Sequence, residues 1–216
     1  MNYPRYIAVE GVIGAGKTSL ARALAERLDA AFIEEEPEKN PFLPLYYEDP
    51  SRYAFQTQVF FLLSRFRQQA ELVQTDLFRS SVVFDYLFAK DKIFAHLTLN
   101  EEEIGLYEGL ANLLAHRVVR PDLVIYLQNN TDRLIRHIRM RDRSYERNIG
   151  YDYIQKLNEA YNHFFFHYNE APLMVVNASE IDFVRREKDL DELIREIERP
   201  PVGTRYYHPV SSQDTP

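Results

Sequence analysis

The sequence predicts an α/β fold in which a parallel sheet has helices on both faces. Short apolar runs alternate along the chain with longer amphipathic segments of helical length, which is the pattern of a doubly wound parallel sheet. Hydrophobic residues make up 45% of the 216 residues, enough for a substantial core, and this length suits one α/β domain. We therefore expect a single domain over residues 1–199.

The apolar runs predict five buried strands, and the amphipathic segments predict six helices. The expected strands are Tyr6–Glu10, Ala31–Glu35, Ser81–Asp85, Leu123–Gln128 and Leu173–Asn177. The expected helices are Lys17–Leu28, Tyr53–Thr75, Glu101–His116, Thr131–Arg139, Tyr151–Asn169 and Asp189–Glu198, the last with acidic residues in its first turn. From Pro200 the composition shifts to Pro, Gly, Ser and polar residues, which predicts a loosely held tail over residues 200–216.

Composition excludes several classes of function. The net charge of −7 argues against a nucleic-acid binder that uses a large basic face. The absence of cysteine excludes disulfides, thiolate catalysis and zinc–cysteine sites. The longest apolar run, near Val59–Leu63, is too short to span a bilayer, and no signal peptide is recognisable at the N-terminus. We expect a cytoplasmic protein.

A glycine-rich motif for phosphate binding follows the first expected strand. Residues 11–18 match the pattern G-x-x-x-x-G-K-[ST] between a strand and a helix, the context that the motif requires. They are Gly11, Val12, Ile13, Gly14, Ala15, Gly16, Lys17 and Thr18. The glycines let backbone N–H groups point at phosphate oxygens, Lys17 would reach the β- and γ-phosphates, and Thr18 would hold Mg²⁺. The motif predicts a P-loop NTPase fold that binds ATP or another nucleoside triphosphate.

Carboxylates follow the second and third strands, and ligands of open parallel sheets bind beyond these strand ends. The second strand runs into Glu34-Glu35-Glu36-Pro37, a candidate general base for an acceptor hydroxyl, although a solvated acidic turn would look the same. The third ends at Asp85, the expected position of a Mg²⁺-orienting aspartate, although it could instead be a plain strand terminus.

A basic segment follows the fourth strand, and in so acidic a protein it predicts an arginine-rich lid. Its members are Arg133, Arg136, Arg139, Arg141, Arg143 and Arg147, with Arg141 and Arg143 expected past the helix end. Such a lid would neutralise charge on a transferring phosphoryl group and exclude water. A solvated basic face is the alternative. No Asn-Lys-x-Asp run for guanine is present, which argues against a GTP switch and favours a small-molecule kinase.

Taken together, these motifs resemble the deoxyribonucleoside kinase family, in the branch that takes deoxycytidine, deoxyguanosine and deoxyadenosine, and in its short bacterial form. The resemblance covers Tyr6 to Phe183. It implies ATP-dependent phosphorylation of a deoxyribonucleoside 5′-hydroxyl, with purines favoured, Mg²⁺ on Thr18 and Asp85, and a homodimer.

The resemblance also implies roles for individual residues. Glu35 would be the base, chosen over Glu36 because it keeps the spacing to Asn40-Pro41 and to Tyr47. Tyr47 and Glu146 would bind the sugar 3′-hydroxyl. Gln58 and Arg65 would read the base, and Asp91 would pair with Arg65. Lys17, Arg141 and Arg143 would stabilise the transferring charge. Asp182 and Phe183 would lie at the donor adenine, although Phe183 could equally anchor the core.

One position departs from the family pattern. Most members have arginine after the acidic residue that corresponds to Asp85, but this sequence has Tyr86. Lys90 is the candidate replacement for that cation. Two alternatives to a deoxynucleoside kinase remain open: a kinase of nucleoside monophosphates or other metabolites, with Arg52, Arg65 and Arg67 available to bind a phosphate, and a nucleotide-sensing regulator that does not transfer phosphate.

Overall fold

The computed structural model describes residues 3–74, 81–147, 149–179, 183 and 186–208. Within these residues, six parallel strands form one sheet in the order β2-β3-β1-β4-β5-β6. The strands are β1 (Tyr6–Gly11), β2 (Ala31–Ile33), β3 (Val82–Phe84), β4 (Leu123–Gln128), β5 (Leu173–Asn177) and β6 (Thr204–Tyr207). The first strand thus lies in the middle of the sheet, paired with β3 on one side and β4 on the other.

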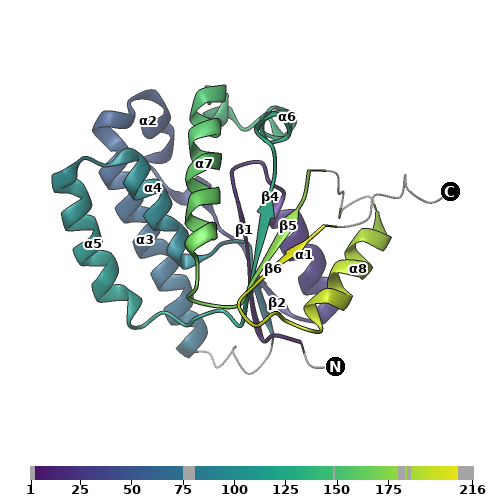
Figure 1. The fold of residues 1–216 in the computed structure, drawn as a ribbon. Helices are drawn as coiled ribbons and strands as arrows, with labels where there is room; N and C mark the ends of the chain where they lie inside the picture. The colour runs from purple at the N-terminus through teal and green to yellow at the C-terminus, as the bar shows by residue number, and fades with distance from the viewer. Residues whose placement is uncertain (1–2, 75–80, 148, 180–182, 184–185, 209–216) are drawn as a thin grey trace.

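Helices cover both faces of the sheet, as the sequence predicts (Figure 1). One face carries α1 (Lys17–Leu28) and α8 (Glu187–Ile197). On the other side lie α3 (Pro50–Gln74), α4 (Asp91–Thr98), α5 (Glu101–Ala115) and α7 (Tyr151–His167), with α2 (Leu43–Glu48) and α6 (Thr131–Arg141) toward the end of the sheet where β1 and β4 finish. The short helices α2 and α4 were not expected from the sequence, because each spans no more than eight residues and shows too little periodicity.

Two apolar clusters hold these layers together. The larger surrounds β1, β3, β4 and β5, whose apolar residues are almost completely buried between the helices. The smaller lies among α2, α3, α4 and α5 and is centred on Tyr46, Leu62, Tyr107 and Ala111.

The sixth strand corrects the prediction of five strands and of a loose tail from residue 200. Thr204–Tyr207 pairs with β5 in register from Leu173↔Thr204 to Val176↔Tyr207. This strand lies at the edge of the sheet, and its residues alternate between exposed and half-buried. A short edge strand needs no apolar run, so its polar composition resembles that of a tail. The remainder of the predicted tail, residues 209–216, lies outside the described residues.

The second strand ends earlier than expected, and the early end positions two carboxylates. Pairing between β2 and β3 stops at Ile33↔Phe84. Beyond it, the side chain of Asp85 replaces the strand partner, because its Oδ1 accepts the backbone N–H of Glu35 at 2.6 Å. The chain therefore leaves the sheet at Glu34 and Glu35, close to the carboxyl end of β1.

Candidate active site

The phosphate-binding motif forms the turn between β1 and α1. Gly14 has φ +85°, and a Cβ atom there would lie 2.7 Å from the carbonyl oxygen of Leu134 in α6, so only glycine fits. Helix α1 begins at Lys17 with Gly16 as its N-cap, without a capping side chain and without an acidic residue in its first turn. The N-terminal N–H groups of α1 are therefore not capped by a side chain and carry the positive end of the helix dipole, which suits phosphate.

The ammonium group of Lys17 lies over this turn. Its Nζ donates to the backbone oxygens of Gly11 at 2.7 Å and Val12 at 3.2 Å. Burial lowers the pKa of Lys17 to about 8 in spite of the opposing Glu10 carboxylate, and the nearby Lys90 lowers it as well. These contacts hold the Lys17 ammonium group at the phosphate loop.

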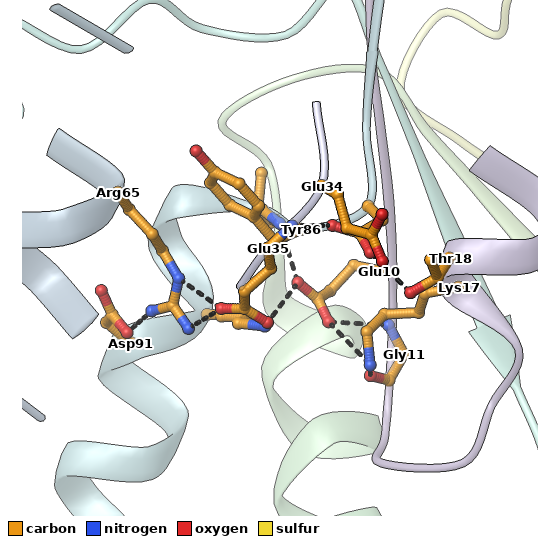
Figure 2. Close-up of polar contacts among 12 residues, drawn as sticks. Glu10, Gly11, Lys17, Thr18, Glu34, Glu35, Arg65, Tyr86 and Asp91 are labelled. Carbon is orange, nitrogen blue, oxygen red and sulfur yellow. Dashed lines mark hydrogen bonds and ion pairs between the residues drawn. The ribbon is translucent and has the colours of Figure 1, made fainter. Parts of the chain in front are cut away.

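Glu35 forms ion pairs with two cations, Arg65 and Lys90, and Figure 2 shows Arg65 beside it. Its Oε1 accepts hydrogen bonds from Nε and a terminal nitrogen of Arg65, and its Oε2 accepts one from Lys90 Nζ at 2.6 Å. Burial alone would raise the pKa of Glu35, but the charges and hydrogen bonds of Arg65 and Lys90 outweigh it and hold this pKa well below its usual range. Glu35 is therefore ionised at neutral pH.

The neighbouring Glu36 points elsewhere. It is exposed on the surface, where it forms an ion pair with Lys39 at 2.7 Å. Of the two glutamates between which the sequence left a choice, Glu35 lines the cavity and Glu36 does not. Glu34 is also at the cavity wall but pairs outward with Arg22.

Asp85 and Thr18 lie side by side at the phosphate end of the site. Thr18 Oγ1 donates a hydrogen bond to Asp85 Oδ2 at 2.5 Å. Burial raises the pKa of Asp85, while hydrogen bonds from Thr18 and from the Glu35 backbone oppose the rise. Both side chains offer the hard oxygen ligands that Mg²⁺ prefers. No group of three or more His, Cys, Asp or Glu side chains suited to a metal occurs among the residues that the structure describes. Thr18 and Asp85 are therefore the residues that would hold a Mg²⁺ ion at the phosphates.

A cavity joins the phosphate loop to the acceptor side. It brings together most of the residues that the sequence singled out. Those lining it include Ile13, Lys17, Thr18, Glu35, Tyr47, Gln58, Arg65, Asp85, Arg141, Arg143 and Glu146. Asp91 contributes indirectly, because it forms a buried ion pair with Arg65 behind the wall.

The arginine segment is held by carboxylates. Arg141 donates two hydrogen bonds to the buried Glu146, at 2.7 and 2.6 Å. Arg143 contacts Glu38 at 3.1 Å and donates to the Tyr145 hydroxyl at 2.9 Å, and that hydroxyl donates to Glu38 at 3.1 Å. Arg141 is the last residue of α6 and not beyond it as expected, because the helix continues until Asp142 adopts φ +44°. Arg136, Arg139 and Arg147 are exposed, so only part of the segment faces the cavity.

Tyr86 occupies the position where the family pattern has arginine. Its hydroxyl donates to Gln68 Oε1 at 2.9 Å, and its ring lies 5.7 Å from the guanidinium carbon of Arg65. Phe61 contacts the same guanidinium group at 5.1 Å. Tyr86 therefore helps to fix Arg65 by a cation–π contact, while Lys90 contacts Glu35.

The predicted adenine-binding residues are less well defined. Phe183 packs partly buried against the larger apolar cluster, which agrees with a role as an anchor of the core. Asp182 lies outside the described residues.

Two carboxylates near the cavity, Glu10 and Glu38, were not identified from the sequence. Glu10, the penultimate residue of β1, is completely buried, and Glu38 binds the arginine segment. A carboxylate at the end of an apolar strand, directly before the phosphate loop, is the signal that could have identified Glu10. Glu38 had no signal of its own, because it follows three other glutamates in an acidic turn.

Comparison with known proteins identifies the family of this chain. A family model described as deoxynucleoside kinase matches residues 7–200. The chain is 30% identical over 202 residues to a deoxyguanosine kinase of Bacillus subtilis (strain 168), an alignment that covers 91% of this chain and 98% of that protein. It is 33% identical over 181 residues to a deoxyadenosine kinase of Dictyostelium discoideum, covering 81% of this chain and 73% of that protein.

A similar fold has been solved. The structure of deoxyadenosine kinase from M. mycoides with bound dATP superposes with a TM-score of 0.77 at 26% identity, and the match covers 88% of this chain and 97% of that one. None of the helices within the described ranges is both long and apolar enough to cross a membrane. The family model matches residues 7–200, which is well over half of the 216-residue chain. The chain therefore belongs to the deoxynucleoside kinase family of transferases.

Proposed function

We propose that the protein transfers the γ-phosphoryl group of ATP to the 5′-hydroxyl of a deoxyribonucleoside, with purine deoxynucleosides preferred. The observation that carries the proposal is the position of Glu35, which lines the same cavity as Lys17 and Thr18 of the phosphate loop. A carboxylate opposite a phosphate loop is the arrangement that brings an acceptor hydroxyl in line with a transferring phosphoryl group.

In this mechanism Glu35 orients the 5′-hydroxyl and receives its proton late. Arg65 and Lys90 hold the pKa of Glu35 low against the opposing effect of burial, so the carboxylate is a weak base before transfer. A loose phosphoryl-transfer transition state needs little deprotonation of the attacking oxygen at the outset. The hydroxyl proton becomes acidic as its oxygen bonds to phosphorus, and Glu35 then accepts it.

Three cations stabilise the charge that spreads over the transferring group. Lys17 leaves its backbone partners for the β- and γ-phosphates, and Arg141 and Arg143 turn from Glu146 and Glu38 toward the γ-phosphate. Each of these side chains lines the cavity. A Mg²⁺ ion held by Thr18 and Asp85 would supply further charge neutralisation at the phosphates.

We place the acceptor between α2 and α3. Gln58 and Arg65 are buried on one face of α3 and would read the base, while Tyr47 and Glu146 would bind the 3′-hydroxyl. Relatives named deoxyguanosine kinase and deoxyadenosine kinase support the purine preference. The donor adenine would lie near Phe183 and Asp182.

A nucleoside monophosphate acceptor is less well supported. Such an acceptor needs cations in the pocket for its existing phosphate. Arg52 and Arg67 are both exposed, and neither is among the residues that line the cavity, while Arg65 already pairs with Glu35 and Asp91. A regulator that only senses nucleotides would not need Glu35 and its partners Arg65 and Lys90 in the cavity.

The decisive experiment measures acceptor-dependent ADP release from ATP and Mg²⁺ with the four deoxynucleosides and their monophosphates. We expect turnover with deoxyadenosine or deoxyguanosine and a loss of about 10²-fold or more in kcat for Glu35→Gln. Glu36→Gln is the matched control and should keep its activity. Turnover with monophosphates alone, or a dead Glu36→Gln enzyme beside an active Glu35→Gln enzyme, would contradict the proposal.

We further propose that the protein acts in the cytoplasm as a homodimer that buries the outer face of α5. Leu106 and Leu113 are 59% and 73% exposed, and their spacing of seven residues puts them on one side of the helix. Gly105 and Gly109 lie near the same face with open space around them, which allows close approach of a second copy.

A further inference from the structure

Glu10 is a buried carboxylate that the proposed mechanism does not use. We infer that Glu10 is a positioning residue which holds Lys17 and Lys90 on either side of the phosphoryl-transfer path, an inference that rests on the proposed function. Figure 2 shows its carboxylate between Glu35 and the phosphate loop.

The contacts of Glu10 join four separate segments. Its Oε1 accepts the backbone N–H of Gly11 at 2.9 Å and the hydroxyl of Tyr161 at 3.3 Å, and its Oε2 accepts the backbone N–H of Leu87 at 2.8 Å. Lys17 Nζ lies 4.0 Å from Oε1, and Lys90 Nζ lies 4.0 Å from Oε2. Each oxygen of this buried carboxylate thus accepts a backbone N–H group and has one of the two ammonium groups nearby.

The charge of Glu10 has a specific use at this place. A fully buried charge is expensive unless it is paired, and an apolar residue could fill the end of β1 at lower cost. Lys17 serves the ATP phosphates and Lys90 contacts Glu35, so one cation belongs to the donor and the other to the acceptor. Without the carboxylate between them the two ammonium groups would repel each other. Glu10 therefore allows both to remain charged and close to the reacting atoms.

The first test is the variant Glu10→Gln, which removes the charge and keeps the size of the side chain. We expect kcat for acceptor-dependent ADP release to fall by about tenfold to a hundredfold, with the KM for the deoxynucleoside within about threefold, because Glu10 does not line the cavity. The control is Asp122→Asn. Asp122 also accepts two backbone N–H groups, those of Arg5 and Tyr6 at 2.9 Å each, but at the opposite end of β1. It should keep wild-type kcat.

A double-mutant cycle with Lys90→Met separates positioning from simple support of the backbone. Once Lys90 has lost its charge, Lys17 has no neighbouring ammonium group to be shielded from, so Glu10→Gln should then lower kcat by less than about threefold. A backbone support would cost the same factor in both backgrounds. If Glu10→Gln unfolds, Glu10→Asp is used in its place, because it keeps the charge but withdraws it from both lysines. We expect a kcat loss of at least about fivefold in the folded protein.

The outcomes divide clearly. A large loss in the wild-type background that shrinks beside Lys90→Met supports the inference. A kcat within about twofold of wild type, or a loss equal in both backgrounds, overturns it while leaving the proposed function intact. Wild-type protein without acceptor-dependent turnover overturns the proposed function, and the inference with it.

Discussion

At the scale of single residues, the ion pairs of Glu35 determine how stability should depend on pH. Burial would raise the pKa of Glu35, but Arg65 and Lys90 hold it below the ordinary value. In the unfolded chain Glu35 titrates near its ordinary pKa of about 4.3. The folded protein therefore binds fewer protons than the unfolded chain at acidic pH. The contribution of Glu35 is complete above about pH 4.3 and is lost as the pH falls toward the lower pKa of the folded state.

We expect the difference in free energy of unfolding between wild type and Glu35→Gln to shrink by about 1.4 kcal/mol per pH unit below pH ~4. Urea unfolding of both proteins between pH 3 and pH 7 measures it. Glu36→Gln should show no such slope, since its pair with Lys39 is exposed. Parallel stability curves for wild type and Glu35→Gln would contradict the ion-pair argument.

Glu35 and Glu36 also show how far the roles of single residues can be predicted from the sequence. Their spacing to later landmarks favoured Glu35, and the structure agrees that Glu35 lines the cavity. Nothing in the local sequence specifies that Lys90 and Arg65 approach the two oxygens of one carboxylate, because they come from segments 30 and 55 residues away along the chain. The role of Glu10 was missed for the same reason.

At the scale of elements, helix α6 constrains the phosphate loop. Gly14 has positive φ, and a Cβ atom would collide with the Leu134 carbonyl of α6, whereas Gly16 has positive φ and open space. Gly14→Ala should therefore destabilise the protein by about 1–3 kcal/mol more than Gly16→Ala. Urea unfolding of both variants checks this difference. Equal costs would show that backbone strain, rather than the contact with α6, excludes side chains here.

The arginine segment should matter for turnover far more than for stability. The pair of Arg143 with Glu38 is partly exposed, with side-chain exposures of 35% and 54%, so it contributes less than about 1 kcal/mol. Arg143→Ala should lower kcat by about 10²-fold, because it removes one cation from the transferring group. The matched control is Arg139→Ala, since Arg139 is exposed and does not line the cavity. Equal kcat values for the two variants would remove Arg143 from the mechanism.

The apolar strands and the long helices were predicted well, whereas the short elements β6, α2 and α4 were not. Apart from one polar residue near the end of each, β1, β4 and β5 are apolar and almost completely buried, so their positions follow from composition alone. β6 is half-exposed and α2 has six residues, and both exist because a neighbouring element covers one side. Tertiary contacts of this kind leave no periodic signal in the chain.

At the scale of the whole molecule, the active site is assembled from distant parts of the chain. The ends of β1 and β3, the start of α1, the segment after β2, the inner face of α3 and the end of α6 all reach one cavity. The motifs identified each part separately, and the parallel sheet explains why strand ends converge. What the sequence could not supply is the pairing between parts, such as Arg141 with Glu146 or Arg143 with Glu38.

The outer face of α5 leads to a prediction about assembly. The inner face is buried through Tyr107 and Ala111, whereas Leu106 and Leu113 remain exposed. If a second copy covers this face, light scattering after size exclusion should give a mass near twice 25.6 kDa. The double change Leu106→Glu and Leu113→Glu should then give the monomer mass, because it would place four buried charges in the interface. Val202→Glu is the control, since Val202 is fully exposed and far from α5 in the sequence. A monomeric wild-type protein, or a dimer that survives the double change, would exclude α5 as the interface.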